Sequence, residues 1–503
     1  MPPESLLCYF LQTVHFFGPK LCGPTEGTPK AETMSPHRRE FYSLVARAAA
    51  SAREGRLDEA AAAYRAALQF LPSHPEVLLN LGVVTAGLGD HRAALASFNA
   101  ALASEPRYAA AHYNRAVALR ALGREQEAVS AFAAALAIEP GNYEAHRAIA
   151  FCLLASGNHE RALDHFARTY ELRRGDDRNG MAAKSLEYAN LTKLHHDAQQ
   201  FRHLASLGRD ARQFEALARS YEAVARVFPE NITRLCDADL ERLGDSYNTA
   251  IHMAEAPAIP AGTLAARPDR EQLLSDFTLA RPGAVYFDDL LTPQAVTRLR
   301  CHLLQSTIWH DFTHIEGFVA AYLEDGLACP LLLQIVTELR GRFPELLSDH
   351  PLTQAWAFKA VRTDAAVDVH TDDGAVSLNF WMTPTDANGD PGRGGLGICL
   401  MPPPADWAVQ DYRGDQRRAR DFLQCHRERT LTVPYRVNRG VLFESRLIHY
   451  SDAPHFLDGY LNHRINLTML FGTGGRPPET PHYANVARVS DPPFAAVTEN
   501  RPI

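Results

Sequence analysis

Two histidines and one aspartate in the second half of the chain have the types and the spacing of ligands for one metal ion. His370 and Asp372 are separated by a single residue, and His449 follows an apolar stretch much further along the sequence. Alternate side chains of a β-strand point to the same face, so His370 and Asp372 can reach one ion together. Two histidines and a carboxylate on one side of a metal leave three coordination positions open, which is what oxygen chemistry at Fe(II) requires.

The neighbouring sequence distinguishes this motif from chance pairs. The chain has 22 His and 59 Asp or Glu residues, so a few H-x-D or H-x-E pairs arise by accident, and we interpret 74–76 and 426–428 in this way. Only the motif at 370–372 is followed by a tight turn, at 373–374, and then by an apolar strand over 375–382. A glycine-rich return and a second apolar strand that leads towards the other histidine complete the pattern.

The sequence around the motif predicts short strands that are separated by Pro, Gly, Asn and Asp. Helices are expected before the strands, around residues 292–304 and 328–341. The expected strands are Gln354–Val361, Val367–His370, Ala375–Met382, Gly395–Met401, Thr430–Val433, Gly440–Phe443 and Arg464–Phe471. This pattern predicts a sandwich or a jelly roll.

The order H-x-D, strand, G-G-x, strand, H and a basic residue on the next strand resembles the prolyl 4-hydroxylase-like branch of the 2-oxoglutarate oxygenases, over about residues 280–475. The resemblance implies a double-stranded β-helix, a jelly-roll or cupin-like barrel with flanking helices. It implies that His370, Asp372 and His449 are the metal ligands and the catalytic residues. It also implies that Arg464 anchors the far carboxylate of 2-oxoglutarate, which a guanidinium can hold with two hydrogen bonds.

Other residues of the cosubstrate site are open to more than one interpretation. Lys359, on the strand before His370, is a rival anchor for the cosubstrate. Asn379 and Thr468 are expected to line the same site, although packing residues could also stand there. Compared with the prolyl hydroxylases, the distance from His449 to the basic residue is long and the insertion from Pro402 to Arg429 is large, so the substrate pocket is left undefined.

The resemblance also implies the reaction and its cofactors. Fe(2+) is the expected metal, 2-oxoglutarate and O2 are the expected cosubstrates, and ascorbate is a further cofactor that the family allows. The expected enzyme is therefore a 2-oxoglutarate-dependent dioxygenase, a hydroxylase. The alternatives are a small-molecule oxygenase whose repeats serve assembly, and a non-catalytic repeat scaffold with a metal-binding barrel.

The first part of the chain repeats itself with a period of 34 residues. One glycine marks the turn of each unit, at Gly55, Gly89, Gly123 and Gly157, and an aromatic residue follows at Tyr64, Phe98, Phe132 and Phe166. A small residue and a proline keep the same step, at Ala60, Ala94, Ala128 and Ala162 and at Pro72, Pro106 and Pro140. This pattern resembles the tetratricopeptide repeat, a pair of antiparallel helices that stacks into an all-α superhelix. The concave groove of such a superhelix is expected to hold a protein or peptide. The alternative is that the array only mediates self-association or spaces the catalytic domain.

The fourth unit has Arg174 where proline is due, so the array is expected to end there and continue into irregular helices. The stretch from Tyr221 to Pro229 resembles one more second helix of a repeat. The histidines at 195, 196 and 203 are interpreted as the solvated face of a polar helix. A turn-rich stretch at 256–262 is expected to be a domain junction. We divide the chain into a disordered leader at 1–37, four repeats at 38–175, a helical connector at 176–256, an oxygenase domain at 257–480 and a tail at 481–503.

The composition excludes several classes of protein. The net charge is -8 and no basic stripe is interleaved with aromatic residues, so nucleic acid is not an expected partner. No apolar stretch is long enough to span a membrane. Eight cysteines without a C-x-x-C pair indicate reduced thiols in a cytoplasmic protein. The apolar residues at 6–17 lack a positive leader and a cleavage site, so residues 1–33 are expected to be an over-extended start or a disordered leader rather than a signal peptide.

Overall fold

The computed structural model describes residues 35–175, 187–208, 210–265, 270–281, 283–362, 365–404, 407 and 416–472. The expected tail at 481–503 and nearly all of the expected leader lie outside these residues. The chain divides into two compact units, the first ending at His165 and the second beginning at Phe166. Within the described residues, no helix is both long and apolar enough to cross a membrane.

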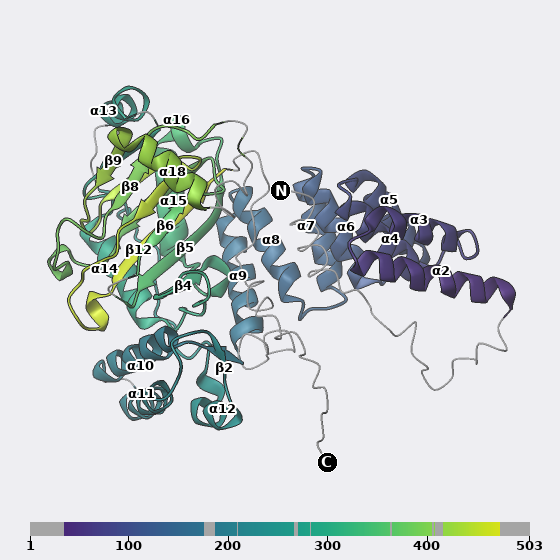
Figure 1. The fold of residues 1–503 in the computed structure, drawn as a ribbon, viewed down its shortest axis with the longest axis horizontal. Helices are drawn as coiled ribbons and strands as arrows, with labels where there is room; N and C mark the ends of the chain where they lie inside the picture. Colours follow the sequence, from purple (N-terminus) through teal and green to yellow (C-terminus); the bar gives the residue numbers. More distant parts are fainter. Residues whose placement is uncertain are drawn as a thin grey trace, which may run out of the picture. The chain divides into compact units, whose positions relative to one another are not determined.

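Paired helices follow one another along the N-terminal part of the chain (Figure 1). They are α2 (Pro36–Arg53), α3 (Leu57–Leu68), α4 (Pro75–Gly87), α5 (His91–Ser104), α6 (Ala109–Ala121), α7 (Glu125–Leu136), α8 (Tyr143–Ala155) and α9 (His159–Arg174). The repeated glycine lies between the two helices of each pair, with a positive φ at Gly55, Gly89, Gly123 and Gly157. A residue with a side chain is strained in this conformation, which explains why the same residue type recurs at the turn.

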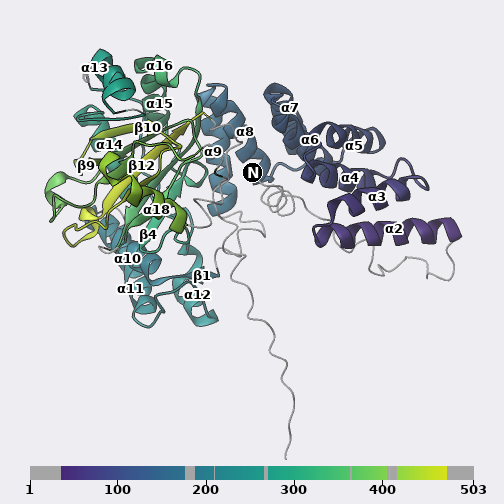
Figure 2. The same ribbon diagram turned by 45° about the horizontal axis from the view of Figure 1, so that its top comes forward.

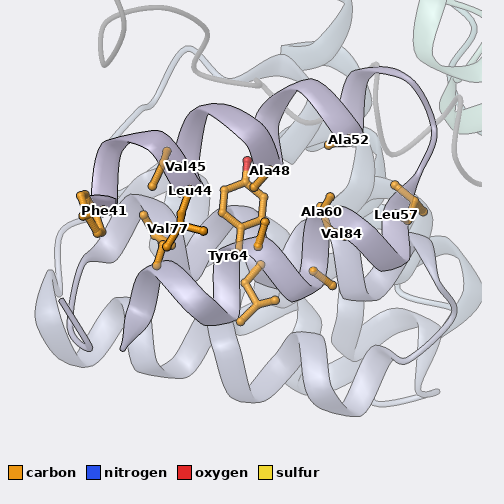
Figure 3. Packing of buried hydrophobic residues seen from close by; sticks show 14 residues of the cluster. Phe41, Leu44, Val45, Ala48, Ala52, Leu57, Ala60, Tyr64, Val77 and Val84 are labelled. Carbon is orange, nitrogen blue, oxygen red and sulfur yellow. The ribbon is translucent and has the colours of Figure 1, made fainter. Parts of the chain in front are cut away.

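Small and aromatic residues at the repeated positions form the core of the first three pairs. Figure 3 shows the first one, where the ring of Tyr64 lies among aliphatic side chains of α2, α3 and α4. Both Ala60 and Tyr64 are completely buried. In the next pair a Cβ added at Gly82 would lie 2.4 Å from the ring of Phe98, so the helices touch too closely for any side chain there. The sequence therefore repeats because the contact between paired helices repeats.

The last repeat helix ends inside the second unit. Arg174, which replaces the expected proline, is 2% exposed, and its Nε lies 3.3 Å from Oδ1 of the buried Asp325. Arg173 pairs with the same carboxylate oxygen at 2.9 Å. The hydroxyl of Tyr170 donates a hydrogen bond to the carbonyl of Thr307 at 3.0 Å. The missing proline thus marks a helix that continues into a packed interior rather than one that stops at the surface.

The expected irregular helices form a small layer of the second unit. They are α10 (Leu191–Ser206), α11 (Ala211–Ala225) and α12 (Asp237–Leu243), and the strand pair β1 (Tyr188–Ala189) and β2 (Thr233–Arg234) accompanies them. Rings of Phe201, Phe214 and Tyr221 pack in their shared core. Gln200 of α10 donates hydrogen bonds to the carbonyls of Leu304 and Ser306, at 3.2 and 2.9 Å, so this layer is joined to the strand-rich region.

Two antiparallel sheets form the rest of the second unit (Figure 2). The six-stranded sheet has the order β3 (Ala284–Phe287), β10 (Gly440–Glu444), β7 (Val376–Trp381), β12 (Arg464–Phe471), β5 (Leu352–Ala360) and β4 (Phe318–Tyr322). The four-stranded sheet has the order β6 (Val367–His370), β11 (His449–Ser451), β8 (Leu396–Cys399) and β9 (Thr430–Val433). Five further helices are α13 (Arg270–Ser275), α14 (Pro293–Gln305), α15 (Pro330–Arg342), α16 (Pro344–Leu347) and α18 (Gln416–Cys425).

Side chains from the facing surfaces of both sheets share one buried cluster. The six-stranded sheet contributes Trp381, Val441 and Phe443, and the four-stranded sheet contributes Leu396, Ile398 and Val433. The sheets therefore pack face to face, as the alternating pattern predicted. The expected closed barrel is not confirmed, because over the described residues the strands form two separate hydrogen-bonded sheets. All seven expected strands and both expected helices occur within a few residues of their predicted limits, whereas β3, β4 and β11 were missed.

Candidate metal centre

The four-stranded sheet brings the three expected metal ligands together. His370 ends β6 and His449 begins β11, and the two residues lie opposite each other in the antiparallel pair. Asp372 follows two residues after His370. Nε2 of His370 lies 4.0 Å from Oδ1 of Asp372, and Nε2 of His449 lies 3.6 Å from Oδ2. One ligand atom from each of the three side chains lies within 4.8 Å of the other two.

Backbone carbonyls fix the orientation of both imidazole rings. Nδ1 of His370 lies 2.7 Å from the carbonyl of Asp368, and Nδ1 of His449 lies 2.9 Å from the carbonyl of Leu447. A carbonyl can only accept, so each Nδ1 is the donor, and Nε2 of each ring is left to face the site, where it can bind a metal through its lone pair. This second hydrogen bond is the usual partner of a histidine that binds a metal.

Hydrogen bonds also hold the carboxylate of Asp372. The hydroxyl of Ser377 on β7 donates to Oδ2 at 2.6 Å, and it lies 2.8 Å from the hydroxyl of Ser445. The backbone N–H of Asp372 donates to the carbonyl of Ser445 at 2.9 Å. The turn passes so close that a Cβ at Gly374 would lie 2.8 Å from Oγ of Ser445. Neither serine was predicted, although Ser377 is a polar residue in the otherwise largely apolar strand β7, which is a recognisable signal.

The three side chains fit a divalent metal ion that prefers nitrogen and oxygen ligands. Two imidazole nitrogens and a carboxylate converge, with one ligand atom of each side chain turned towards the others. A cation is the group that would satisfy all three acceptors at once, and this donor set on one side of the ion matches a non-haem Fe(II) site. Within the part of the chain that the structure describes, no other group of three such side chains converges in this way.

A pocket extends from the metal ligands along the inner face of the six-stranded sheet. One wall carries Phe318, Trp356 and Phe358, from β4 and β5. The other wall is polar and is lined by Asn379, Arg464, Asn466 and Thr468, from β7 and β12. The structure thus brings Arg464, Asn379 and Thr468 to the same pocket as His370, Asp372 and His449. The aromatic wall and Asn466 were not predicted, because neither is close in sequence to a motif.

Arg464 is a buried cation that forms no close ion pair with the described residues. It is 3% exposed, Nε donates to the carbonyl of Gly394 at 2.8 Å, and within the described residues it makes no ion pair. Burial lowers the pKa of the guanidinium to about 10, which still leaves it charged at neutral pH. A buried charge of this kind is normally paired, so an anion in the pocket would complete its surroundings.

Asn379 and Thr468 are partners across neighbouring strands. Both are buried, and Oδ1 of Asn379 accepts no hydrogen bond within the described residues. Oγ1 of Thr468 accepts a hydrogen bond from the amide of Asn466 at 3.0 Å. These groups can bind or orient a polar ligand beside Arg464.

Lys359 does not lie in this pocket. Trp356 and Phe358 of β5 face the metal ligands, so alternation directs Lys359 to the opposite face of the sheet. There its Nζ lies 3.2 Å from Nε2 of His196. The expected role of Lys359 as a rival cosubstrate anchor is therefore not supported by its position.

The interpretation of the histidines of α10 as a solvated face is wrong for His196. His195 is exposed, but His196 is completely buried and contacts the sheet. The sequence of α10 is polar although the helix is largely buried. Several of its buried polar side chains form hydrogen bonds with residues that are distant in the sequence. Tyr221, expected in a second helix of a degenerate repeat, lies in α11.

The large insertion at 402–429 contributes a helix that contacts the strand of the first ligand. α18 packs on β6, and Nε of Arg420 lies 3.2 Å from Oδ1 of Asp368. The Arg420 guanidinium holds the pKa of Asp368 below its usual value. The carbonyl of Asp368 is the one that orients His370, so the insertion supports the metal site from outside the pocket.

Comparisons with known proteins identify the N-terminal part of the chain. Three family models, each described as tetratricopeptide repeat, match residues 43–84, 79–143 and 119–178. The expected array of tetratricopeptide repeats is therefore confirmed. None of these three matches reaches the residues of the metal centre. No curated protein matches the chain.

Several solved structures are similar to about a quarter of the chain. A crystal structure of MamA is 20% identical, covers 26% of this chain and 77% of its own, and has a TM-score of 0.26. An O-GlcNAc transferase mutant of Thermobaculum terrenum is 26% identical, covers 27% of each chain and has a TM-score of 0.25. The first TPR of Spaghetti (RPAP3) bound to an HSP90 peptide is 24% identical, covers 24% of this chain and 96% of its own, and has a TM-score of 0.23.

Proposed function

We propose that this chain is an Fe(II)- and 2-oxoglutarate-dependent dioxygenase that hydroxylates a protein or peptide recruited by its repeats. One observation carries the proposal: His370, Asp372 and His449 converge in a pocket that also contains the buried guanidinium of Arg464. The two facing antiparallel sheets support a double-stranded β-helix of the prolyl 4-hydroxylase-like kind. Fe(II) bound there would supply the activation of O2 that is coupled to oxidative decarboxylation of 2-oxoglutarate and to transfer of oxygen to the substrate.

Each residue of the pocket has a defined task in this proposal. His370, Asp372 and His449 hold the metal on one side, and the hydrogen bonds of Ser377 and of the backbone carbonyls keep them in place. Arg464 binds the carboxylate of the cosubstrate that is remote from the metal. Asn379 and Thr468 orient the chain of the cosubstrate between these two points.

The repeats supply the second part of the proposal. Stacked tetratricopeptide repeats present a concave surface, and surfaces of this kind bind extended peptides or other proteins. Binding energy gathered there could hold a substrate at the metal pocket. The six cysteines in the described residues are free thiols, which agrees with the reducing, cytoplasmic location that we propose.

The role of Arg464 leads to a specific prediction. In the Arg464→Ala variant, the affinity for 2-oxoglutarate is expected to fall by about 10- to 100-fold, because a charge-assisted hydrogen bond contributes about 1.5–3 kcal/mol. The affinity for Fe(II) should stay nearly unchanged, because Arg464 does not contact the metal ligands. Calorimetry under anaerobic conditions measures both affinities.

The conservative variant Arg464→Lys provides the matched control. It keeps the charge but loses the planar pair of donors, so the loss of affinity should be smaller than for alanine. An unchanged affinity for 2-oxoglutarate in both variants would remove the carboxylate anchor from this proposal.

The proposal as a whole is tested by comparing the affinity for 2-oxoglutarate with and without bound iron. 2-Oxoglutarate should bind tightly to the iron-loaded protein and weakly to the metal-free protein, because it contacts both the metal and Arg464. Equal affinity with and without metal would place the binding site elsewhere.

A further inference from the structure

A buried network of polar side chains lies behind the six-stranded sheet, on the face opposite the metal pocket. Lys359 and His196 are both completely buried, and Asp197 is 5% exposed. Nζ of Lys359 lies 4.3 Å from the ring centre of Trp309 and 4.1 Å from that of Tyr460. The metal centre does not contain these groups, and polar groups buried so deeply are stable only when they are hydrogen-bonded.

The partners in this network determine which atom of each hydrogen bond is the donor and which is the acceptor. Nδ1 of His196 lies 2.9 Å from the carboxylate of Asp197, so that nitrogen carries the hydrogen and Nε2 is free to accept from Lys359 at 3.2 Å. The other oxygen of Asp197 accepts from Lys193 at 2.5 Å. The ammonium of Lys359 also donates to the hydroxyl of Tyr460 at 2.9 Å.

The hydroxyl of Tyr460 completes the network. It donates to the carbonyl of Leu304 at 2.7 Å, at the end of α14, so its oxygen is held from two sides. Nζ of Lys359 also lies against the faces of both the Trp309 and the Tyr460 rings, which fixes the lysine beside the tyrosine. The position of Tyr460 is therefore set jointly by the helix α10, the strand β5 and the end of α14.

Tyr460 lies immediately before the strand that carries Arg464. It begins the turn η8 (Tyr460–Asn462), and β12 starts at Arg464 two residues after that turn ends. On the other side, the hydroxyl of Thr383 donates to the carbonyl of His463 at 2.6 Å and accepts from the N–H of Ile465 at 3.0 Å. The backbone around Arg464 is thus fixed by Thr383 from one side and by Tyr460 from the other.

We propose that Lys359, together with His196 and Asp197 of the connector helix α10, positions Tyr460 and through it the guanidinium of Arg464 in the metal pocket. These are positioning residues, because none of them touches the pocket. The inference rests on the proposed function in one respect, which is that the anion held by Arg464 is 2-oxoglutarate. It assigns the helical connector an effect on cosubstrate binding that is transmitted through Tyr460.

The test removes a single oxygen atom. In the Tyr460→Phe variant, the dissociation constant and the KM for 2-oxoglutarate are expected to rise about 3- to 10-fold, in the range of one lost buried hydrogen bond. The affinity for Fe(II) and kcat at saturating cosubstrate should be unchanged. Lys359→Met, which removes the donor, should change the same two constants in the same direction.

Tyr247→Phe is the matched control. The hydroxyl of Tyr247 also donates to a backbone carbonyl, that of Tyr188 at 2.6 Å, and it belongs to the core of the helical layer. Its loss should lower thermal stability and leave the affinity for 2-oxoglutarate unchanged. Circular dichroism and thermal unfolding show that each variant is folded before the affinities are compared.

The outcomes separate this inference from the proposed function. If Arg464→Lys weakens 2-oxoglutarate binding and Tyr460→Phe does not, the network is a structural element only and the inference is wrong, while the proposed function stands. If Tyr247→Phe weakens binding as much as Tyr460→Phe, the effect is one of general stability and the inference is also wrong. If the iron-loaded wild-type chain does not bind 2-oxoglutarate, both proposals fail.

Discussion

His449→Ala is expected to abolish specific binding of Fe(II) and with it all turnover of 2-oxoglutarate. The protein supplies three ligands, so the loss of one leaves a two-point contact that water can replace. Removal of an outer partner of a metal ligand already costs about 10- to 100-fold in affinity, and removal of the ligand itself should cost more. Equivalent losses are expected for His370→Ala and Asp372→Ala.

His455→Ala provides the control for this experiment. His455 is an exposed histidine in the loop that follows β11, and it belongs to no metal-binding group in the described residues. Metal titration of each variant, with circular dichroism to confirm the fold, gives the comparison. Full Fe(II) affinity in His449→Ala, or an equal loss in His455→Ala, would contradict the assigned site.

A shortened chain that begins at Pro257 is expected to fail to fold, whereas one that begins at Asn158 should fold and bind Fe(II). The turn-rich sequence at 256–262 suggested the first starting point. However, the cut removes both arginines that pair with Asp325, a side chain that is 1% exposed. Breaking a buried ion pair costs about 3–5 kcal/mol, which is a large part of the 5–15 kcal/mol that stabilises a typical domain.

Further contacts are lost in the same cut. The cut deletes Gln200, whose amide donates to the carbonyls of Leu304 and Ser306. It also deletes Asn190, whose amide donates to the carbonyl of Phe312. Near-ultraviolet circular dichroism and thermal unfolding compare the two shortened chains. Cooperative unfolding of the chain that begins at Pro257, together with wild-type affinity for Fe(II), would show that α9 and the connector are dispensable.

The chain that begins at Asn158 also tests the role of the repeats. It retains the metal pocket, so it should still convert 2-oxoglutarate slowly without a protein substrate. It should lose hydroxylation of the natural target, because the surface that holds the target is gone. Equal hydroxylation by the shortened and the full chain would make the repeats an assembly device.

The sequence predicted those features that depend on local spacing. A 34-residue period fixed the positions of the helix pairs, because each pair makes the same contact. Alternation within strands predicted the limits of β5, β7 and β12, and the H-x-D spacing placed two ligands on one face. β11 was missed because its three residues are too few to show any period.

The features that were not predicted depend on contacts between residues far apart in the chain. Lys359 was assigned to the pocket because the sequence correctly predicted strand β5. Which face of that strand lines the pocket depends on the elements packed against it, and these are distant in the sequence. His196 was assigned to solvent because α10 is polar, but it is buried, and its hydrogen-bond partners are Lys359, 163 residues away, and the adjacent Asp197. The ion pair between Arg174 and Asp325 could not be predicted either, since the two residues are 151 positions apart and nothing in the sequence near one points to the other.

Formation of succinate from 2-oxoglutarate by the purified full chain tests the central claim most directly. The conversion should require both Fe(II) and air, should stop when the iron is chelated, and should be absent from the His370→Ala variant. If iron occupies the site of His370, Asp372 and His449 but the wild-type chain forms no more succinate than that variant, the second unit is a metal-binding scaffold and not an oxygenase.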